Sequence, residues 1–407
     1  MSYLQFVLRN RRFLAFGVLM TMASSFGQTY FVALFGADIR AEFGLGHGSF
    51  GFIYSIATVV SAGCLIWVGR LIDEMPLRRY AVFVCTGLIA ATFALAFAQT
   101  IVFLFLALFA LRLTGQGLMT HTAITGMVRG FSATRGKAVS IANLGMPLAE
   151  GTFPIMAVAI TATLGWRHSW ILFGVGLSVL LVPTVLWLLR DDGRTAPNAT
   201  PAAPLPEPAG RRWTRGDVLR DPRFYLVLPA VLAPSFIITG MFFHQVHLAD
   251  SKGWSLTLLA TAFIGFSAAH SLTGLATGPA IDRFGATRLM PYVLLPLGCG
   301  LLLLTLSGHP AIAFGYMIAA GIGAGIASTT VAAMWAEVYG LAHLGAIRAL
   351  TTSLGVLSSA LSPVLFGWMI DLGVSMDRLA LMNLAYVLLA AALVPLAFRR
   401  AVAARPV

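Results

Sequence analysis

The chain has 407 residues, of which 58% are hydrophobic and only 10% are charged, and its mean hydropathy is +0.86. A soluble domain carries about 25% charged residues, so this composition excludes a soluble protein and predicts an integral membrane protein that lies in a lipid bilayer. The formal net charge of +12 does not indicate a nucleic-acid partner, because the basic residues stand in short segments between apolar runs, where they act as topology signals.

Apolar runs long enough to cross the membrane recur along the whole chain. A bilayer core about 30 Å thick needs roughly 20 residues of helix, and twelve such runs predict twelve transmembrane helices. In chain order they span 13–36, 50–69, 80–98, 101–126, 138–163, 167–189, 224–247, 255–279, 289–307, 311–336, 344–370 and 377–398. We expect the first run to be retained as a helix, because no small-residue cleavage site follows it.

The distribution of lysine and arginine tests this count. With the N-terminus in the cytoplasm, 22 of the 27 basic residues fall in segments assigned to the inside and 4 in segments assigned to the outside. A missing or extra helix would invert every later segment and destroy this bias. The bias therefore predicts an even number of helices with both termini cytoplasmic, in a plasma membrane such as a bacterial inner membrane.

The chain also divides into two related halves. Residues 190–222 are rich in proline, alanine and charge, which predicts a flexible cytoplasmic linker between bundles at 1–189 and 223–407. The halves match at a shift of 209 residues in Asp73 and Asp282, Gly136 and Gly345, and Pro154 and Pro363. We therefore predict an all-α integral membrane fold of two pseudo-symmetric six-helix bundles, an architecture used for alternating access.

Two copies of one loop motif stand at equivalent places in the halves. GRLIDEMPLRR at 69–79 recurs as GPAIDRFGATR at 278–288, while RLTGQG at 112–117 and NLGMPLAEG at 143–151 follow in the first half. With these motifs the whole chain resembles the major facilitator superfamily, and parts of the second half are similar to its monocarboxylate-transporter-like members. In the first copy, Pro76 and Leu77 depart from the usual motif. The resemblance implies a monomeric carrier of a small molecule.

The resemblance also implies a cytoplasmic gate. Asp73 would meet the start of helix 11, near His343 and Arg348, and by symmetry Asp282 would meet the start of helix 5. The alternative is that these charges are only solvated loop residues. The predicted gating residues are Gly69, Asp73, Arg78, Gly278, Asp282, Arg283 and Arg348.

Two ionisable residues lie deep inside predicted helices of the first half. Arg112 is about 16 Å and Glu150 about 20 Å from the outer ends of helices 4 and 5, at 1.5 Å per residue. Charges at that depth mark functional sites by default. In one interpretation the Arg112 guanidinium donates hydrogen bonds to a substrate carboxylate. Glu150 then pairs with Arg112 in the empty carrier, or takes a proton when the substrate displaces it. In the other, the two residues form a permanent structural bridge.

The second half has no such pair. The residues equivalent to Arg112 and Glu150 at the shift of 209 are Gly321 and Ser359. A purely architectural bridge would be expected in both copies, so its absence favours the functional interpretation.

Other polar residues in predicted helices are weaker candidates. Gln28 and Gln116 would line the cavity, since helices 1 and 4 do so in the family, or would bond neighbouring helices. His121 is a gate or packing residue, and His270 is a titrating or core histidine. We expect His244 to lie in the membrane interface at the outer end of helix 7.

The remaining patterns exclude several functions. The sequence has no Walker motif, no cluster of histidine and cysteine with metal-ligand spacing, and no nucleophile–base arrangement, so we expect no enzyme, cofactor or metal. We predict a secondary carrier of a small organic anion of the monocarboxylate class, coupled to protons through Glu150. The alternative is proton-coupled efflux of drugs or other hydrophobic compounds. A membrane sensor would need a signalling domain, for which the sequence offers no candidate.

Overall fold

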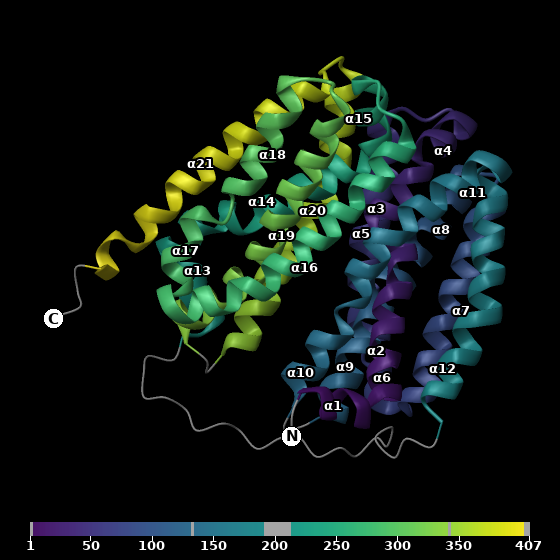
Figure 1. Ribbon diagram of the computed structural model, residues 1–407, viewed down its shortest axis with the longest axis horizontal. Helices are drawn as coiled ribbons and strands as arrows, with labels where there is room; N and C mark the ends of the chain where they lie inside the picture. The colour runs from purple at the N-terminus through teal and green to yellow at the C-terminus, as the bar shows by residue number, and fades with distance from the viewer. Residues whose placement is uncertain (1–2, 132–133, 191–212, 341–342, 403–407) are drawn as a thin grey trace. The chain divides into compact units, whose positions relative to one another are not determined.

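The computed structural model describes residues 3–131, 134–190, 213–340 and 343–402, and every regular element in these ranges is a helix. The chain divides into two compact units, Met1–Ala203 and Pro204–Val407 (Figure 1). Most of the predicted linker, residues 191–212, lies outside the described residues.

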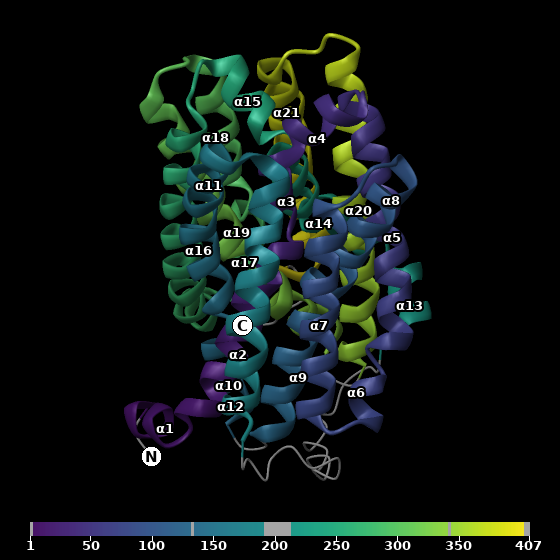
Figure 2. The same ribbon diagram turned by 90° about the vertical axis from the view of Figure 1, so that its right-hand side faces the viewer.

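The first unit contains the first half of the predicted transmembrane helices, with short turns between them. In it, α8 packs against both α5 and α7 (Figure 2). In chain order the elements are α1 (Tyr3–Arg9), α2 (Arg11–Ala23), η1 (Ser24–Gly27), α3 (Thr29–Val32), η2 (Ala33–Phe35), α4 (Gly36–Phe43), α5 (His47–Val68), α6 (Leu71–Glu74), α7 (Leu77–Ala96), α8 (Ile101–Leu111), η3 (Arg112–Met119), α9 (Thr120–Gly130), α10 (Arg135–Ala142), α11 (Gly145–Gly176), η4 (Leu177–Leu181) and α12 (Val182–Leu188).

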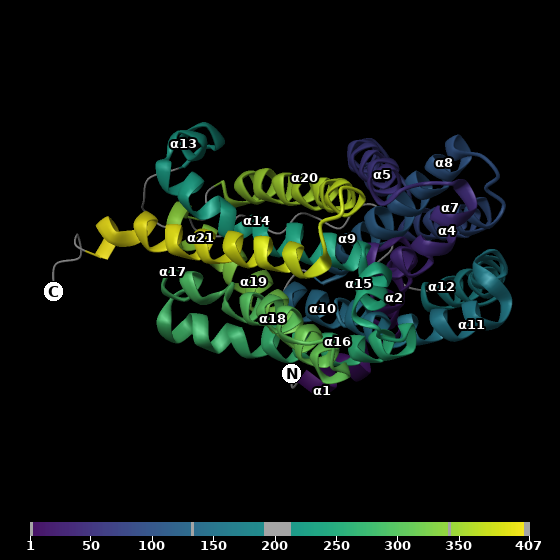
Figure 3. The same cartoon turned by 90° about the horizontal axis from the view of Figure 1, so that it is seen from above.

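The second unit repeats the plan with longer uninterrupted helices. In it, α14 packs against both α20 and α21 (Figure 3). Its elements are α13 (Arg215–Arg220), α14 (Pro222–Phe243), α15 (Gln245–Lys252), α16 (Leu256–Phe284), α17 (Ala286–Leu289), η6 (Met290–Tyr292), α18 (Leu295–Leu306), α19 (Pro310–Tyr339), α20 (Leu344–Asp371) and α21 (Met376–Val402).

The number of membrane spans agrees with the predicted twelve. Among the described residues, ten helices are long and apolar enough to cross a bilayer, and Arg11–Gly27 with Thr29–Phe43, bent by 46°, forms an eleventh span. One of the ten, Arg135–Leu188, has 54 residues, or about 81 Å at 1.5 Å per residue, far more than one bilayer. It turns at Gly165, whose φ of 75° suits glycine, and therefore supplies two spans.

The end of the predicted linker is helical. Thr214 and Asp217 form a capping box at the start of α13, each side chain bonding the backbone N–H of the other. Asp221 then caps α14. Burial opposes ionisation of Asp221, but hydrogen bonds from Arg223 outweigh it and hold the pKa of Asp221 below its usual value. The chain thus enters the second unit through ordered, capped turns, which the proline-rich composition of 190–222 did not predict.

Each unit has an ion pair at one end that joins two helices, and the acid and the base stand on opposite partners in the two units. In the first, Arg167 at the turn into the sixth span pairs with Glu42 of α4 at 2.5 Å and donates to a carbonyl just after α7. In the second, Lys252 of α15 pairs with Asp377 of α21 at 2.6 Å and donates to a carbonyl of α18. The paired residues differ by 210 positions, one more than the shift of 209 between the halves, and the cation and the anion have exchanged places.

Candidate functional site

The first unit buries a complete guanidinium group. Arg112 is 2% exposed and begins the π-helical segment η3, a rare backbone form that frequently occurs at functional sites. Its Nε donates to the Thr58 hydroxyl at 3.0 Å, and its Nη1 donates to the Gly27 carbonyl at 3.0 Å. Arg112 therefore joins the fourth span to the first and second spans.

A small polar cluster surrounds this arginine. Its Nη1 also reaches the Thr29 hydroxyl at 3.4 Å, and the Tyr54 hydroxyl donates to the same Thr29 oxygen at 2.9 Å. The guanidinium carbon lies 5.0 Å from the centre of the Tyr54 ring, within the range of a cation–π interaction. All these partners are neutral, and among the described residues no hydrogen bond leaves Nη2 of Arg112. The site thus holds a positive charge and a donor group that a ligand can use.

The site depends on a break in the first span. Gln28 adopts an extended conformation between η1 and α3, with φ −80° and ψ 149°. The break leaves the Gly27 carbonyl free to accept from Arg112, because Phe31 N–H bonds to the Gln28 carbonyl instead. The backbones of the two spans touch here, since a Cβ on Gly115 would lie 2.7 Å from the Gly27 Cα. Only glycine fits such an approach.

Glu150 lies on a helix that packs against the broken span. It sits in the first turns of α11 and is 8% exposed, and α11 contacts η1 and α3. In the described part of the chain, the hydrogen bonds of Arg112 go to the first two spans and not to Glu150. The described hydrogen bonds thus show no direct bridge between Arg112 and Glu150, and the ligand-binding role of the two residues stays a prediction.

The other predicted site residues fall in three places. Gln28 and Gln116 are half-buried at the junction of the first and fourth spans, so the structure brings them together with Arg112. His121 lies further along the same span, where its Nε2 is 3.1 Å from the Gly69 carbonyl. His270 belongs to the second unit, in α16, with its ring 5.7 Å from that of Phe266.

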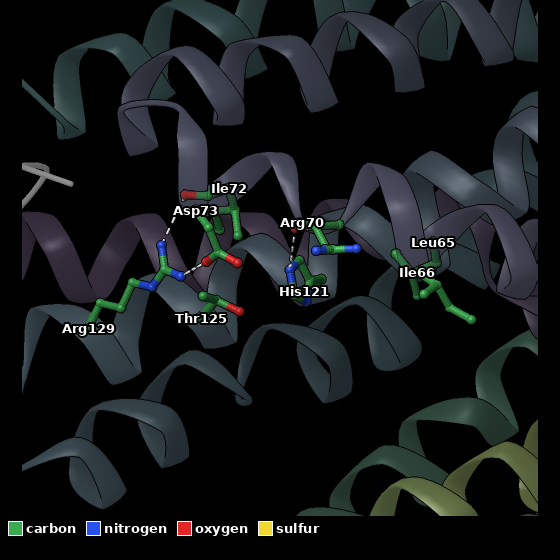
Figure 4. Close-up of a pocket in the computed structure, with 9 residues that line it drawn as sticks. Leu65, Ile66, Arg70, Ile72, Asp73, His121, Thr125 and Arg129 are labelled. Atoms are coloured by element: carbon green, nitrogen blue, oxygen red, sulfur yellow. Dashed lines mark hydrogen bonds and ion pairs between the residues drawn. The ribbon is translucent and has the colours of Figure 1, made fainter. Parts of the chain in front are cut away.

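The first copy of the loop motif lines a pocket of about 390 Å³ (Figure 4). Asp73 forms an ion pair with Arg129 at the end of α9, and Nη1 of Arg129 also donates to the Ile72 carbonyl at 2.9 Å. His121 and Arg70 line the same pocket. Arg129 holds the motif loop in place within the first unit, yet it was absent from the predicted site, because the family pattern directed attention to the start of helix 11.

Comparison with known proteins identifies the chain. The family model described as Major Facilitator Superfamily matches residues 17–246 and 235–407. The chain belongs to the major facilitator superfamily. It is 24% identical to human Monocarboxylate transporter 6 over 377 residues, which cover 87% of this chain and 73% of that protein.

Solved structures share the superfamily fold. A bacterial homologue of the human lysosomal transporter Spinster, in an inward-facing and unoccupied conformation, has a TM-score of 0.71 and 14% identity, over 100% of this chain and 99% of the other. The nucleoside transporter NupG has a TM-score of 0.72 and 13% identity, over 95% of this chain and all of the other. The protein is thus an integral membrane transporter of this superfamily.

The second copy of the superfamily motif is held differently from the first. Glu337 at the end of α19 accepts the N–H groups of Ala286 at 2.6 Å and Thr287 at 3.0 Å, at the N-terminus of α17, where negative charge is favoured. The motif residues Asp282 and Arg283 are exposed in α16. Gly278, Arg78 and Arg348 likewise lie at or near the surface of their own units.

His244 ends α14, at the end of the seventh span where the sequence places it. It is 3% exposed at the junction of α14 and α15, and its Nε2 is 2.9 Å from the Pro363 carbonyl of α20. Pro363 lies inside α20, so His244 bonds the backbone of a neighbouring span. The apolar run alone did not show this contact with α20.

The second unit has no counterpart of the buried Arg112. Gly321, the equivalent of Arg112, packs against the backbone of Phe266, and Gly325, the equivalent of Gln116, lies where a Cβ would be 2.5 Å from the His270 carbonyl. The α16–α19 pair is therefore in direct backbone contact, whereas the matching pair in the first unit is separated by the polar cluster around Arg112.

Proposed function

We propose that this major facilitator superfamily transporter carries a small monocarboxylate with proton coupling. The observation that carries the proposal is the buried guanidinium of Arg112, whose partners are all neutral. A buried charge without a counter-ion costs several kcal/mol. A substrate carboxylate would supply the missing negative charge and match the planar donor fork.

The relative of known name supports the same class of cargo. The name of human Monocarboxylate transporter 6 denotes a carrier of monocarboxylates, and the likeness spans most of both proteins. The polar cluster is small, with the Tyr54 ring on one side of the guanidinium. Such a site suits a compact anion with a short apolar part.

Glu150 is the candidate for the proton. It is the buried acid of the first unit among the described residues, and its helix α11 packs against the same broken span that contacts Arg112. In the proposed cycle Glu150 binds a proton when a substrate carboxylate occupies Arg112. The proton then neutralises Glu150, and Arg112 balances the charge of the substrate while the carrier changes state. The proton leaves to water on the opposite side together with the substrate.

Ligand-dependent thermal stability of the purified carrier tests the class of cargo. We expect acetate, L-lactate or pyruvate to raise the melting temperature, because a ligand that binds only the folded state stabilises it. The same ligand should have no effect on Arg112→Ala. Stabilisation by lipophilic cations such as tetraphenylphosphonium, with none by carboxylates, would instead support efflux of hydrophobic compounds.

The two loop motifs are proposed to gate the carrier on its cytoplasmic side. Asp73 and Asp282 are both exposed within their units, so they are available to contacts that differ between states. We expect the double variant with Asp73→Asn and Asp282→Asn to change the ratio of inward- to outward-facing carrier, measured by labelling of single cysteines at each side. The control is Asp250→Asn, an exposed acid of α15 outside the motifs. An unchanged ratio with unchanged transport would contradict the gate.

A further inference from the structure

Two hydrogen-bond donors of the site converge on one oxygen atom of the broken first span. The Thr29 hydroxyl oxygen accepts from Nη1 of Arg112 at 3.4 Å and from the Tyr54 hydroxyl at 2.9 Å. Both donor side chains are buried. A guanidinium N–H and a tyrosine O–H that point at one position are donors suited to a carboxylate oxygen, which accepts several hydrogen bonds at once.

The two other acceptors around Arg112 are held by the packing of the unit. Thr58, which accepts from Nε at 3.0 Å, lies in the 22-residue α5 and donates to the Tyr54 carbonyl at 2.9 Å. The Gly27 carbonyl accepts from Nη1 at 3.0 Å. Its backbone touches the fourth span, where a Cβ on Gly27 would lie 2.2 Å from the Leu111 carbonyl oxygen. We therefore expect these two acceptors to stay in place when a ligand binds.

The Thr29 contact is the one that a ligand can replace. At 3.4 Å it is the longest hydrogen bond of Arg112, beyond the roughly 2.7–3.2 Å of an ordinary N–H···O bond. Thr29 follows the extended Gln28 and begins the four-residue helix α3, and a helical threonine has two favourable χ1 rotamers. Rotation about one bond can therefore remove the hydroxyl from Nη1 with the backbone in place.

A carboxylate can use the donors that this rotation frees. One of its oxygens would stand where the Thr29 hydroxyl stands and accept from Nη1 and from Tyr54. The other would accept from Nη2, from which no hydrogen bond leads within the described residues. Nη1 and Nη2 form the end-on pair of a bidentate contact between guanidinium and carboxylate. The side-on pair is already in use, because Nε donates to Thr58.

We propose that the Thr29 hydroxyl occupies the place of a substrate carboxylate oxygen in the substrate-free carrier, and that Tyr54 is a further substrate-binding residue. Thr29 and the substrate then compete for the same two donors. This competition weakens substrate binding, and the return of the hydroxyl to Arg112 favours release of the substrate. The inference rests on the proposed function, since it assigns the contacts of a carboxylate at Arg112.

Substitutions of the two residues should change the affinity for L-lactate in opposite directions. Thr29→Val keeps the shape of the side chain without its oxygen, so we expect about two- to tenfold tighter binding, because one hydrogen bond no longer competes. For Tyr54→Phe we expect binding roughly tenfold weaker or more, since a hydrogen bond to a charged acceptor is lost. Thr29→Ser keeps the hydroxyl and should bind as wild type does. The concentration dependence of thermal stabilisation of the purified carrier gives each dissociation constant.

Two matched controls remove the same groups at other buried positions. Thr122→Val deletes a hydroxyl whose hydrogen bond, to the Leu118 carbonyl, stays within the fourth span. Tyr316→Phe deletes the hydroxyl of a buried tyrosine in the second unit. Both variants should bind L-lactate with the affinity of wild type.

The outcomes separate this inference from the proposed function. Equal or weaker binding of L-lactate by Thr29→Val would show that its hydroxyl does not compete with the substrate, and unchanged binding by Tyr54→Phe would remove Tyr54 from the site. Either result overturns the proposal while binding by wild type stands. Thr29→Ala, with the same expected tightening, replaces the valine variant if that variant does not fold. If wild type binds none of L-lactate, pyruvate and acetate, the proposed function itself fails, and this result is read without the variants.

Discussion

We expect Arg112→Ala to reduce carboxylate uptake to background while the protein is still made and inserted. The substitution removes the buried positive charge and the donor fork, and losing one partner of a buried, hydrogen-bonded charge pair costs about 2–5 kcal/mol. This corresponds to a loss of roughly 30-fold or more in affinity. Uptake of radiolabelled L-lactate, normalised to the amount of protein in the membrane, measures the effect.

Arg112→Lys is the matched control for this experiment. It keeps the charge but loses the planar fork and the Nε bond to Thr58, so we expect uptake between that of wild type and of the alanine variant. The Gly27 and Thr58 groups lose their partner in Arg112→Ala, so some loss of thermal stability should accompany it. Near-normal lactate uptake by Arg112→Ala would show that this residue is structural.

Glu150→Gln should abolish proton-driven accumulation. Glutamine has the shape of the protonated acid but cannot exchange a proton, so the carrier would shuttle the anion without using the pH gradient. We expect the accumulation ratio to fall from about tenfold per pH unit to about one. The ratio of internal to external L-lactate, measured at several imposed gradients, reports the change.

The comparison for this variant is Asp250→Asn, which neutralises an exposed acid of α15 and should leave the accumulation ratio unchanged. Because uptake down a lactate gradient needs no proton gradient, that activity distinguishes an uncoupled Glu150→Gln carrier from an unfolded one. Accumulation by Glu150→Gln at the wild-type ratio would mean that the proton binds elsewhere.

The helices were predictable because each one is a single apolar run. The predicted run 344–370 is α20 (Leu344–Asp371), and 377–398 falls within α21 (Met376–Val402). The break at Gln28 was not predictable, because the segment SSFGQT contains no proline and was interpreted as part of a continuous helix. Likewise, no residue pattern marks the π-helical turn that begins at Arg112, because its extra residue is a matter of packing rather than propensity.

The burial of Arg112 and Glu150 was predictable, but the direction of their side chains was not. Counting residues at 1.5 Å each placed Arg112 and Glu150 at similar heights, and both are buried. The count does not say which way a side chain points around its helix, so the partners Thr58, Gly27 and Thr29 were missed. Neutral hydroxyls and a carbonyl leave no charge pattern in the sequence.

The contact between Gly321 and the Phe266 backbone has a consequence for mechanical stiffness. Backbones in van der Waals contact leave no side chain that can rotate out of the way, so we expect α16 and α19 to tilt together. The matching helices of the first unit are joined instead by hydrogen bonds that a ligand can exchange for its own. We therefore expect the helix pair of the first unit to deform more easily than the pair of the second unit. The difference comes from one position, where the first unit has Arg112 and the second has Gly321.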